Sequence, residues 1–156
     1  KVIEVLNKVI YNELTAISQY FLHAKKQKNW GLKELAQHEY EESIDEMKHA
    51  DKLSERILFL DGLPNFQLLG RLRIGETVEE VIRAALALEM EALTTLRDAV
   101  EHAEKVRDYV SRDLFRRILD SEEEHVDTLE TQLEMIERMG IQNYIQLNSK
   151  AEHDGE

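Results

Sequence analysis

The chain contains the pattern Glu-x-x-His twice, first at Glu46 and His49 and again at Glu122 and His125. In a helix, residues three apart lie on one face, within about 5–6 Å of each other. Each pair can therefore present a carboxylate and an imidazole to the same neighbour, and both groups are ligands of iron and manganese. One such pair on a charged helix is usually a solvated contact, so the repetition is the informative feature.

Two further glutamates extend the repeat. Glu13 precedes the first pair and Glu89 precedes the second at the same spacing, so one constant shift along the sequence, here called the internal shift, carries the first set onto the second. Four buried carboxylates would cost many kcal/mol unless cations neutralised them. We therefore predict a site for two divalent metals about 3.5–4 Å apart, with one terminal glutamate on each metal, two bridging glutamates and one histidine per metal. Its ligands, and the catalytic residues, would be Glu13, Glu46, His49, Glu89, Glu122 and His125.

Helices must carry these residues, because apolar residues recur at helical spacing along most of the chain. Gly31 would turn the chain back between the first two helices, Thr77 and Glu80 resemble a capping box, and Gly140 would end the fourth helix. The polar segment 105–108 supplies the remaining bend. The predicted fold is all-α, with helices over 4–29, 33–60, 77–105, 109–138 and 141–147.

The segment from Asp61 to Glu76 predicts one long connection. It holds the only proline and three of the six glycines. Such a connection can run the length of a bundle and return the chain to its starting end, which is the topology of ferritin-like bundles. Its apolar residues predict packing against the helices. We expect one ferritin-like di-iron domain over 1–147 and a polar tail over 148–156.

Composition restricts the classes of function. The 156 residues include 42% apolar ones, enough for one domain with a sizeable core. The net charge of −12 argues against nucleic-acid partners. The chain has no cysteine, which excludes disulfides and thiolate metal sites and fits a cytoplasmic protein. No apolar run reaches membrane-spanning length, so we expect no membrane partner.

Seven longer stretches of the chain resemble those of a known protein family: NELTAISQYFLHA, NWGL, EESIDEMKHADKL, RILFLDGLPN, DYVSRDL, SEEEHVDTLETQLEMI and MGIQNYIQL. Through them the chain resembles a bacterioferritin, a haem-containing ferritin of bacteria, over nearly its whole length. The resemblance implies an iron-storage ferroxidase that oxidises Fe(II) with O2 or hydrogen peroxide. It also implies that ferric mineral is stored in a hollow shell of about 24 subunits built from two-fold dimers. It places the family's di-iron ligands on the same six residues.

The resemblance further singles out Met47. In this family the methionine after the second-helix glutamate is an axial ligand of haem b, which lies between two chains and passes electrons from a ferredoxin-like donor for iron release. Met47 would lie about 100° around the helix from Glu46, and so would leave the metal-binding face. Leu14, Ile17 and Phe21 form an apolar stripe that could line such a haem pocket.

The sequence leaves some alternatives open. One is a stand-alone di-iron or di-manganese oxidase or peroxidase of the ferritin-like superfamily, and another is a helical bundle whose carboxylates are structural. Tyr20 could lie near the metals or simply fill the core. Glu41 and Asp45 could form an iron site on the inner surface of the shell. The di-iron centre could be a stable cofactor or a transit site.

Overall fold

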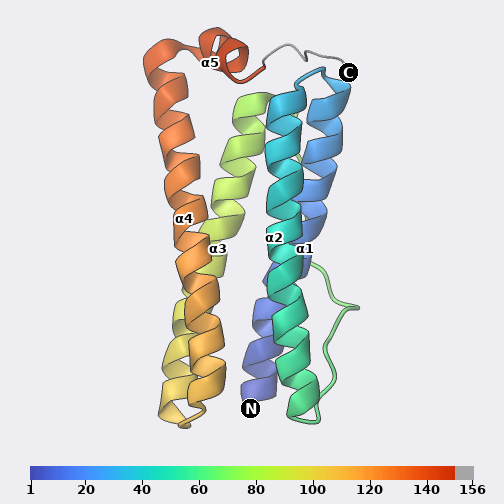
Figure 1. The fold of residues 1–156 in the computed structure, drawn as a ribbon, viewed down its shortest axis with the longest axis vertical. Coiled ribbons are helices and arrows are strands. Elements are labelled where there is room, and N and C mark those ends of the chain that lie inside the picture. The colour runs from blue at the N-terminus through green and yellow to red at the C-terminus, as the bar shows by residue number, and fades with distance from the viewer. Residues whose placement is uncertain (150–156) are drawn as a thin grey trace.

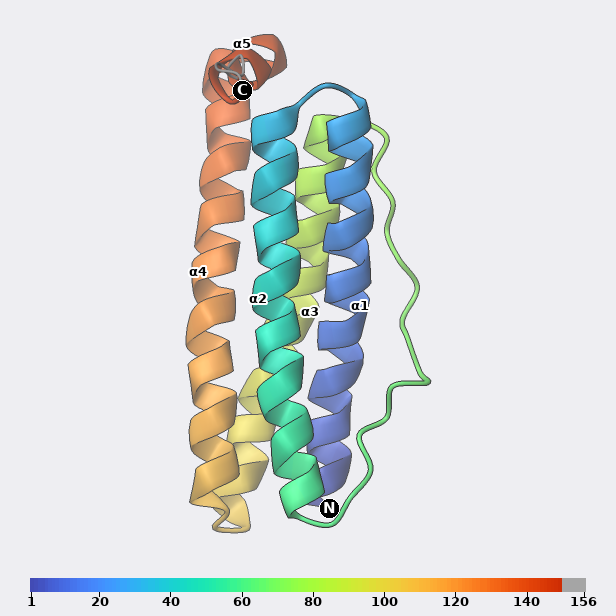
Figure 2. The same cartoon turned by 45° about the vertical axis from the view of Figure 1, so that its right-hand side comes forward.

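A computed structural model describes residues 1–149, and these form four long helices and one short one. The helices are α1 (Val2–Asn29), α2 (Lys33–Phe59), α3 (Val78–Lys105), α4 (Tyr109–Met139) and α5 (Ile141–Leu147). Figures 1 and 2 show the long helices side by side, with α5 across one end. The predicted all-α, ferritin-like class is confirmed, and each predicted helix end lies within two residues of the observed one. No helix in the described part of the chain is long and apolar enough to cross a membrane.

The two hairpin turns use the same hydrogen-bond pattern. After α1, Leu32 N donates to Gln27 O and Gly31 N to Lys28 O, which is a Schellman ending, and Gly31 has φ +86°. Arg107, which the internal shift relates to Gly31, occupies the equivalent position with φ +65°. Glycine adopts this region most readily. The second turn has an arginine there instead, so the sequence gives no glycine signal for this turn. The polar segment 105–108 nevertheless marked it correctly.

The start of α3 is fixed by close backbone packing. Thr77 Oγ1 accepts from Glu80 N at 3.1 Å, as a capping box requires. The reciprocal bond differs from the prediction, because Glu80 Oε1 accepts from Glu76 N at 2.8 Å. A Cβ on Gly75 would lie 2.6 Å from Val81 N, so the chain can approach the helix this closely only at a glycine.

The long connection between α2 and α3 runs along the outside of α1 (Figure 2), as predicted. Polar side chains of α1, spaced four or eight residues apart, accept backbone N–H groups of the connection. We call these bonds the crossover ladder; they join Asn65 N to Asn7 Oδ1 (2.8 Å), Gly70 N to Thr15 Oγ1 (2.8 Å), Arg73 N to Gln19 Oε1 (2.8 Å) and Gly75 N to His23 Nε2 (3.0 Å).

The prediction that the apolar side chains of this connection pack against the helices is wrong for most of them. Five of them are more than half exposed in the single chain: Leu63, Phe66, Leu68, Leu69 and Ile74. The physical reason is that backbone bonds, rather than apolar contacts, hold the connection on α1. The apolar side chains are therefore left facing outwards.

Two apolar clusters fill the ends of the bundle. The turn cluster, near the α3–α4 turn, includes Leu6, Ile10, Leu53, Ile57, Leu96 and Phe115, all of them 0–1% exposed. The α5 cluster, at the other end, includes Tyr20, Leu35, Ile82, Leu88, Leu129 and Tyr144. The six predicted metal ligands lie on the helices between these clusters. The tail from residue 150 onwards falls outside the described residues, so its boundary stays a prediction.

Candidate metal centre

All six predicted ligands meet in one layer midway along the bundle. Each long helix contributes one glutamate, and none of the four carboxylates is more than 1% exposed. The i, i+3 spacing puts each histidine on the same helix face as its glutamate, in α2 and in α4. Hairpins of equal length bring the four glutamates to one height.

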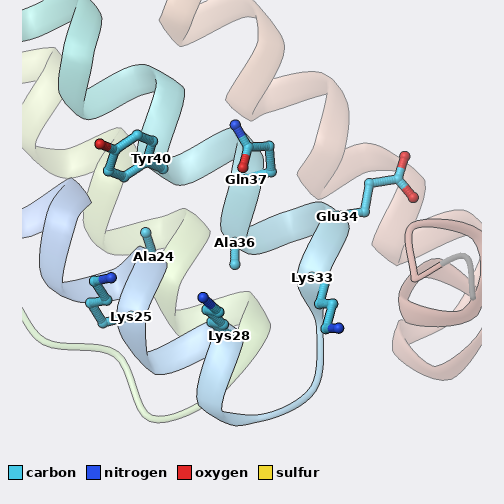
Figure 3. A pocket seen from close by; sticks show the side chains of 8 residues that line it. All are labelled: Ala24, Lys25, Lys28, Lys33, Glu34, Ala36, Gln37 and Tyr40. Carbon is cyan, nitrogen blue, oxygen red and sulfur yellow. The ribbon is translucent and has the colours of Figure 1, made fainter. Parts of the chain in front are cut away.

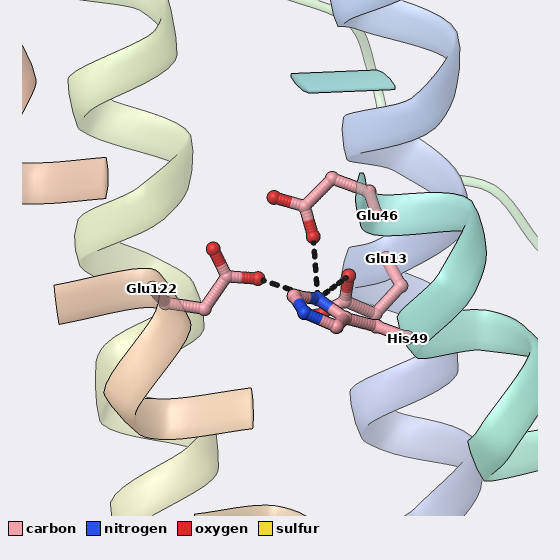
Figure 4. A group of neighbouring side chains, drawn as sticks. All are labelled: Glu13, Glu46, His49 and Glu122. Carbon is pink, nitrogen blue, oxygen red and sulfur yellow. Dashed lines mark hydrogen bonds and ion pairs between the residues drawn. The ribbon is translucent and has the colours of Figure 1, made fainter. Parts of the chain in front are cut away.

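One half of the layer surrounds His49. Its Nδ1 atom lies 3.1 Å from Glu46 Oε1, 3.3 Å from Glu13 Oε1 and 3.4 Å from Glu122 Oε2. Figure 4 shows these three carboxylates converging on the imidazole from α2, α1 and α4. We call this set of ligand atoms the His49 position.

The other half surrounds His125 and repeats the arrangement. His125 Nδ1 lies 2.9 Å from Glu122 Oε1, 3.3 Å from Glu46 Oε2 and 3.3 Å from Glu89 Oε2. We call this second set of ligand atoms the His125 position. Glu46 and Glu122 each direct one carboxylate oxygen to the His49 position and the other oxygen to the His125 position. Both glutamates therefore reach both positions, whereas Glu13 and Glu89 each reach one. Within each set the ligand atoms lie within 4.8 Å of one another.

Burial makes this layer electrostatically demanding. Burial and the charges of Glu46 and Glu122 raise the pKa of Glu13 well above its usual value. Burial and the charge of Glu122 likewise raise the pKa of Glu89 to about 7. Although burial disfavours a charged imidazole, contacts with Glu122 and Glu46 raise the pKa of His49 to about 10. Without a cation, shared protons therefore hold the carboxylates together.

The donor set fits a pair of divalent cations. Four carboxylates and two imidazole Nδ1 atoms offer hard oxygen and borderline nitrogen ligands, which suit iron or manganese. Glu46 Oε2 and Glu122 Oε1 are buried and have no conventional hydrogen-bond partner among the described residues. Cations at both positions would satisfy these oxygens and displace the shared protons.

Three further polar residues surround the layer on the His125 side. Tyr20 Oη donates to Glu89 Oε2 at 2.6 Å, so this tyrosine lies beside the centre as well as in the core. Glu42 Oε1 lies 2.9 Å from His125 Nε2. Glu39 is buried nearby, and its burial and the charges of Glu42 and Glu89 raise its pKa to about 8. Sequence reasoning missed Glu42 and Glu39; the available signal for Glu42 was its place one turn before Glu46.

The predicted haem ligand lies apart from this layer. Met47 is 49% exposed on α2 and Phe21 is 45% exposed on α1, whereas Leu14 is buried and Ile17 partly buried against the turn cluster. The predicted apolar stripe is thus divided between the core and the outer surface. Met47 is accessible to a group outside the single chain.

A separate cavity of about 720 Å³ opens at the α1–α2 turn (Figure 3). Lysine side chains from both helices line it, together with the small side chains of Ala24 and Ala36. It shares no residue with the metal-binding layer. The four carboxylates of the layer are buried, whereas His49 lines a smaller cavity at the surface.

Comparison with known proteins agrees with this architecture. The ferritin-like domain model matches residues 3–139. The bacterioferritin of Mycolicibacterium paratuberculosis is 48% identical over 92% of this chain and 91% of its own. That of Rhodobacter capsulatus is 48% identical over 96% and 92%, and that of Brucella melitensis 46% over 100% and 97%. The chain therefore belongs to the bacterioferritin family of ferritin-like proteins.

Proposed function

We propose that this protein stores iron and that the buried layer is its ferroxidase centre. The observation that carries the proposal is the pair of ligand sets, each with one histidine and one glutamate of its own and both sharing Glu46 and Glu122. This geometry suits two Fe(II) ions bound side by side as substrates. Membership of the bacterioferritin family supports iron as the metal.

The residues of the chain have distinct roles in this scheme. Glu13 and His49 hold one Fe(II) ion, and Glu89 and His125 hold the other. Glu46 and Glu122 bridge the two ions and balance their charge. Because metal binding requires neutral imidazole nitrogens, His49 and His125 release their Nδ1 protons as the iron enters. The apolar clusters above and below keep bulk water away from the layer.

Two adjacent Fe(II) ions can deliver two electrons together. The pair is oxidised to two Fe(III), while O2 takes up two electrons and two protons to give hydrogen peroxide. With hydrogen peroxide as oxidant, the same two electrons and two protons give two water molecules. A two-electron step avoids one-electron reduction products of O2. The resulting Fe(III) is then stored as mineral.

Assembly and haem binding belong to the same proposal. The family supports a cytoplasmic shell of about 24 subunits, built from two-fold dimers around a mineral cavity. The outward apolar residues of the crossover and the exposed Met47 support contact with neighbouring chains. Two such methionines facing each other across a dimer would ligate haem b, which would carry electrons from a ferredoxin-like donor to the mineral during iron release.

An aerobic Fe(II) titration of the metal-free assembly tests the ferroxidase centre. We expect a fast rise in ferric absorbance that saturates near two irons per chain, followed by slower mineral growth. Glu122→Ala should abolish the fast phase, because it removes an oxygen from both positions. Glu123→Ala is the matched control, since Glu123 is the adjacent, exposed residue. An unchanged fast phase in Glu122→Ala would reject the site.

Haem binding is tested separately with Met47→Leu. We expect this variant to lose the haem absorption band and to keep the fast phase of iron oxidation, because Met47 does not contact the layer. Met90→Leu is the control, as Met90 is 47% exposed on α3. Full haem occupancy in Met47→Leu would rule out Met47 as the axial ligand.

A further inference from the structure

The two metal positions have the same ligands but different surroundings. The internal shift that relates the ligands pairs Tyr20 with Leu96, Glu39 with Phe115 and Glu42 with Ile118. The first member of each pair is polar and lies on the His125 side. The second members are apolar side chains of the turn cluster, and all are at most 3% exposed. At these three pairs of positions beside the ligands, the internal shift therefore relates residues of different polarity.

On the His125 side, both unshared ligands have a polar partner. Glu89 accepts the hydroxyl proton of Tyr20 at 2.6 Å. When a histidine gives Nδ1 to a metal, its proton resides on Nε2 and needs an acceptor. Glu42 Oε1 lies 2.9 Å from His125 Nε2, a short polar contact in which the two atoms are not aligned as a hydrogen bond in the metal-free chain. Glu42 is therefore close enough to accept a hydrogen bond from this N–H group when the ring turns towards a metal, and so to fix the orientation of the ring.

On the His49 side, neither unshared ligand has such a partner among residues 1–149. All polar contacts of His49 are made by Nδ1, and its Nε2 has no polar partner in the part of the chain that the structure describes. His49 borders a surface cavity of about 280 Å³, lined also by Lys48, Asp51, Lys52, Leu114, Arg117 and Ile118. The ring of His49 therefore lacks the second polar contact that the ring of His125 makes through Nε2.

We propose that Glu42 is a positioning residue for His125, and that divalent cations fill the His125 position before the His49 position. The proposal rests on the function of the layer as a metal centre and deepens it. Partners that orient a metal-bound histidine typically change metal affinity by 10–100-fold. Because only one half of the centre has such a partner, the two positions differ in affinity even though their ligands match.

Co(II) is a suitable test ion, because it takes the same ligands without being oxidised by air. Crystals of the metal-free assembly are supplied with one Co(II) per chain, and anomalous scattering locates the metal. We expect most of the signal at the His125 position. Equal signals at the two positions, or a stronger one at the His49 position, would overturn the inference while leaving the metal centre in place. No cobalt at either position would reject the proposed function itself.

Variants of Glu42 then test the cause of the difference by calorimetric Co(II) titration. Glu42→Ala should weaken the first binding event by about 10–100-fold. Glu42→Gln should restore part of that loss, because its amide oxygen can still accept from Nε2. Unchanged first binding in Glu42→Ala would show that Glu42 does not position the ring.

Asp45→Asn is the matched control. A carboxylate oxygen of Asp45 lies within 4.8 Å of the ligand atoms of Glu42 and His125, yet Asp45 makes no direct polar contact with that ring. Its replacement removes a nearby charge and keeps the Glu42 contact, so first binding should stay within about twofold of the unmodified chain. A loss as large as that of Glu42→Ala would mean that Glu42 and Asp45 together hold an ion, and would overturn the positioning role.

Discussion

The carboxylate–histidine layer and the apolar clusters that flank it are formed by the same four helices, but they contribute to stability in opposite ways. In the turn cluster, side chains such as Leu53, Ile57 and Phe115 are fully buried. Each such burial stabilises the fold by about 1.5–3 kcal/mol. In the layer, four carboxylates are equally buried, and the raised pKa values of Glu13 and Glu89 reflect the cost. The apolar clusters at the two ends of the bundle thus stabilise the fold enough to offset the cost of burying four carboxylates between them.

The largest effect is expected in the turn cluster. Leu53→Ala should lower the free energy of unfolding by about 2–5 kcal/mol, because it leaves a cavity in a fully packed region. Chemical denaturation of the metal-free protein measures this. Leu58→Ala, on the same helix with a side chain 58% exposed, should cost much less. Similar losses in both variants would show that the core does not carry the stability.

The next effect concerns the layer. Divalent cation at 100 times its dissociation constant should stabilise the fold by about 2.7 kcal/mol, measured as a shift in thermal midpoint with Co(II). Glu13→Gln should reduce this shift strongly, since it removes an unshared ligand. The same variant should leave the metal-free protein about as stable as before or more stable, because glutamine is a neutral substitute of similar size for the protonated carboxyl that the raised pKa of Glu13 favours. A clear loss of stability without metal would contradict this account of the layer.

The pH dependence sharpens the comparison further. The pKa values of Glu39 and Glu89, raised to about 8 and about 7, mean that the folded chain holds protons that the unfolded chain releases above about 4.5. The raised pKa of His49, about 10, acts in the same direction above about 6.5. Stability of the metal-free protein should therefore fall as pH rises from 6 to 9.

Thermal unfolding between pH 6 and 9, with and without Co(II), measures this trend. Glu39→Gln should flatten the metal-free profile, as it removes one of the titrating groups outside the ligand set. Stabilisation by Co(II) should grow with pH, because metal binding displaces protons. A metal-free protein that gains stability towards pH 9 would contradict the predicted direction.

The smallest effect is expected at the boundary between layer and cluster. Tyr20→Phe keeps the ring in the α5 cluster and removes only the hydrogen bond to Glu89. It should cost about 0.5–1.5 kcal/mol, measured by denaturation of the metal-free protein. A loss as large as that of Leu53→Ala would show that the hydroxyl, rather than the ring, dominates the contribution of Tyr20.

The sequence predicted the features that rest on spacing. The internal shift identified six side chains that the structure brings into one layer. Helical periodicity predicted the helices, and the turn and cap residues predicted their ends. The internal shift could not reveal Glu42, because this residue has no counterpart under it: Ile118 stands at the related position. A helical wheel places a residue on a face, but the partner of His125 Nε2 depends on how α2 and α4 pack.

The crossover was predicted in length and direction but not in the way it is held. Leu63 and Phe66 indicated an apolar contact, whereas side chains of α1 such as Thr15 and His23 bind its backbone. An amphipathic segment does not specify whether its apolar side chains contact its own chain or another one. Polar residues on a helix likewise do not reveal which backbone they accept from.

The crossover ladder also determines where the chain has spare length. Between Asn7 and Thr15 the helix rises about 12 Å, while the stretch from Asn65 to Gly70 can span about 17 Å. Between Gln19 and His23 the rise is about 6 Å, and the stretch from Arg73 to Gly75 spans at most about 7 Å. Deletions would therefore be tolerated near Asn65 and excluded near Gly75, so that natural shortening of the loop would be confined to the first half of the connection.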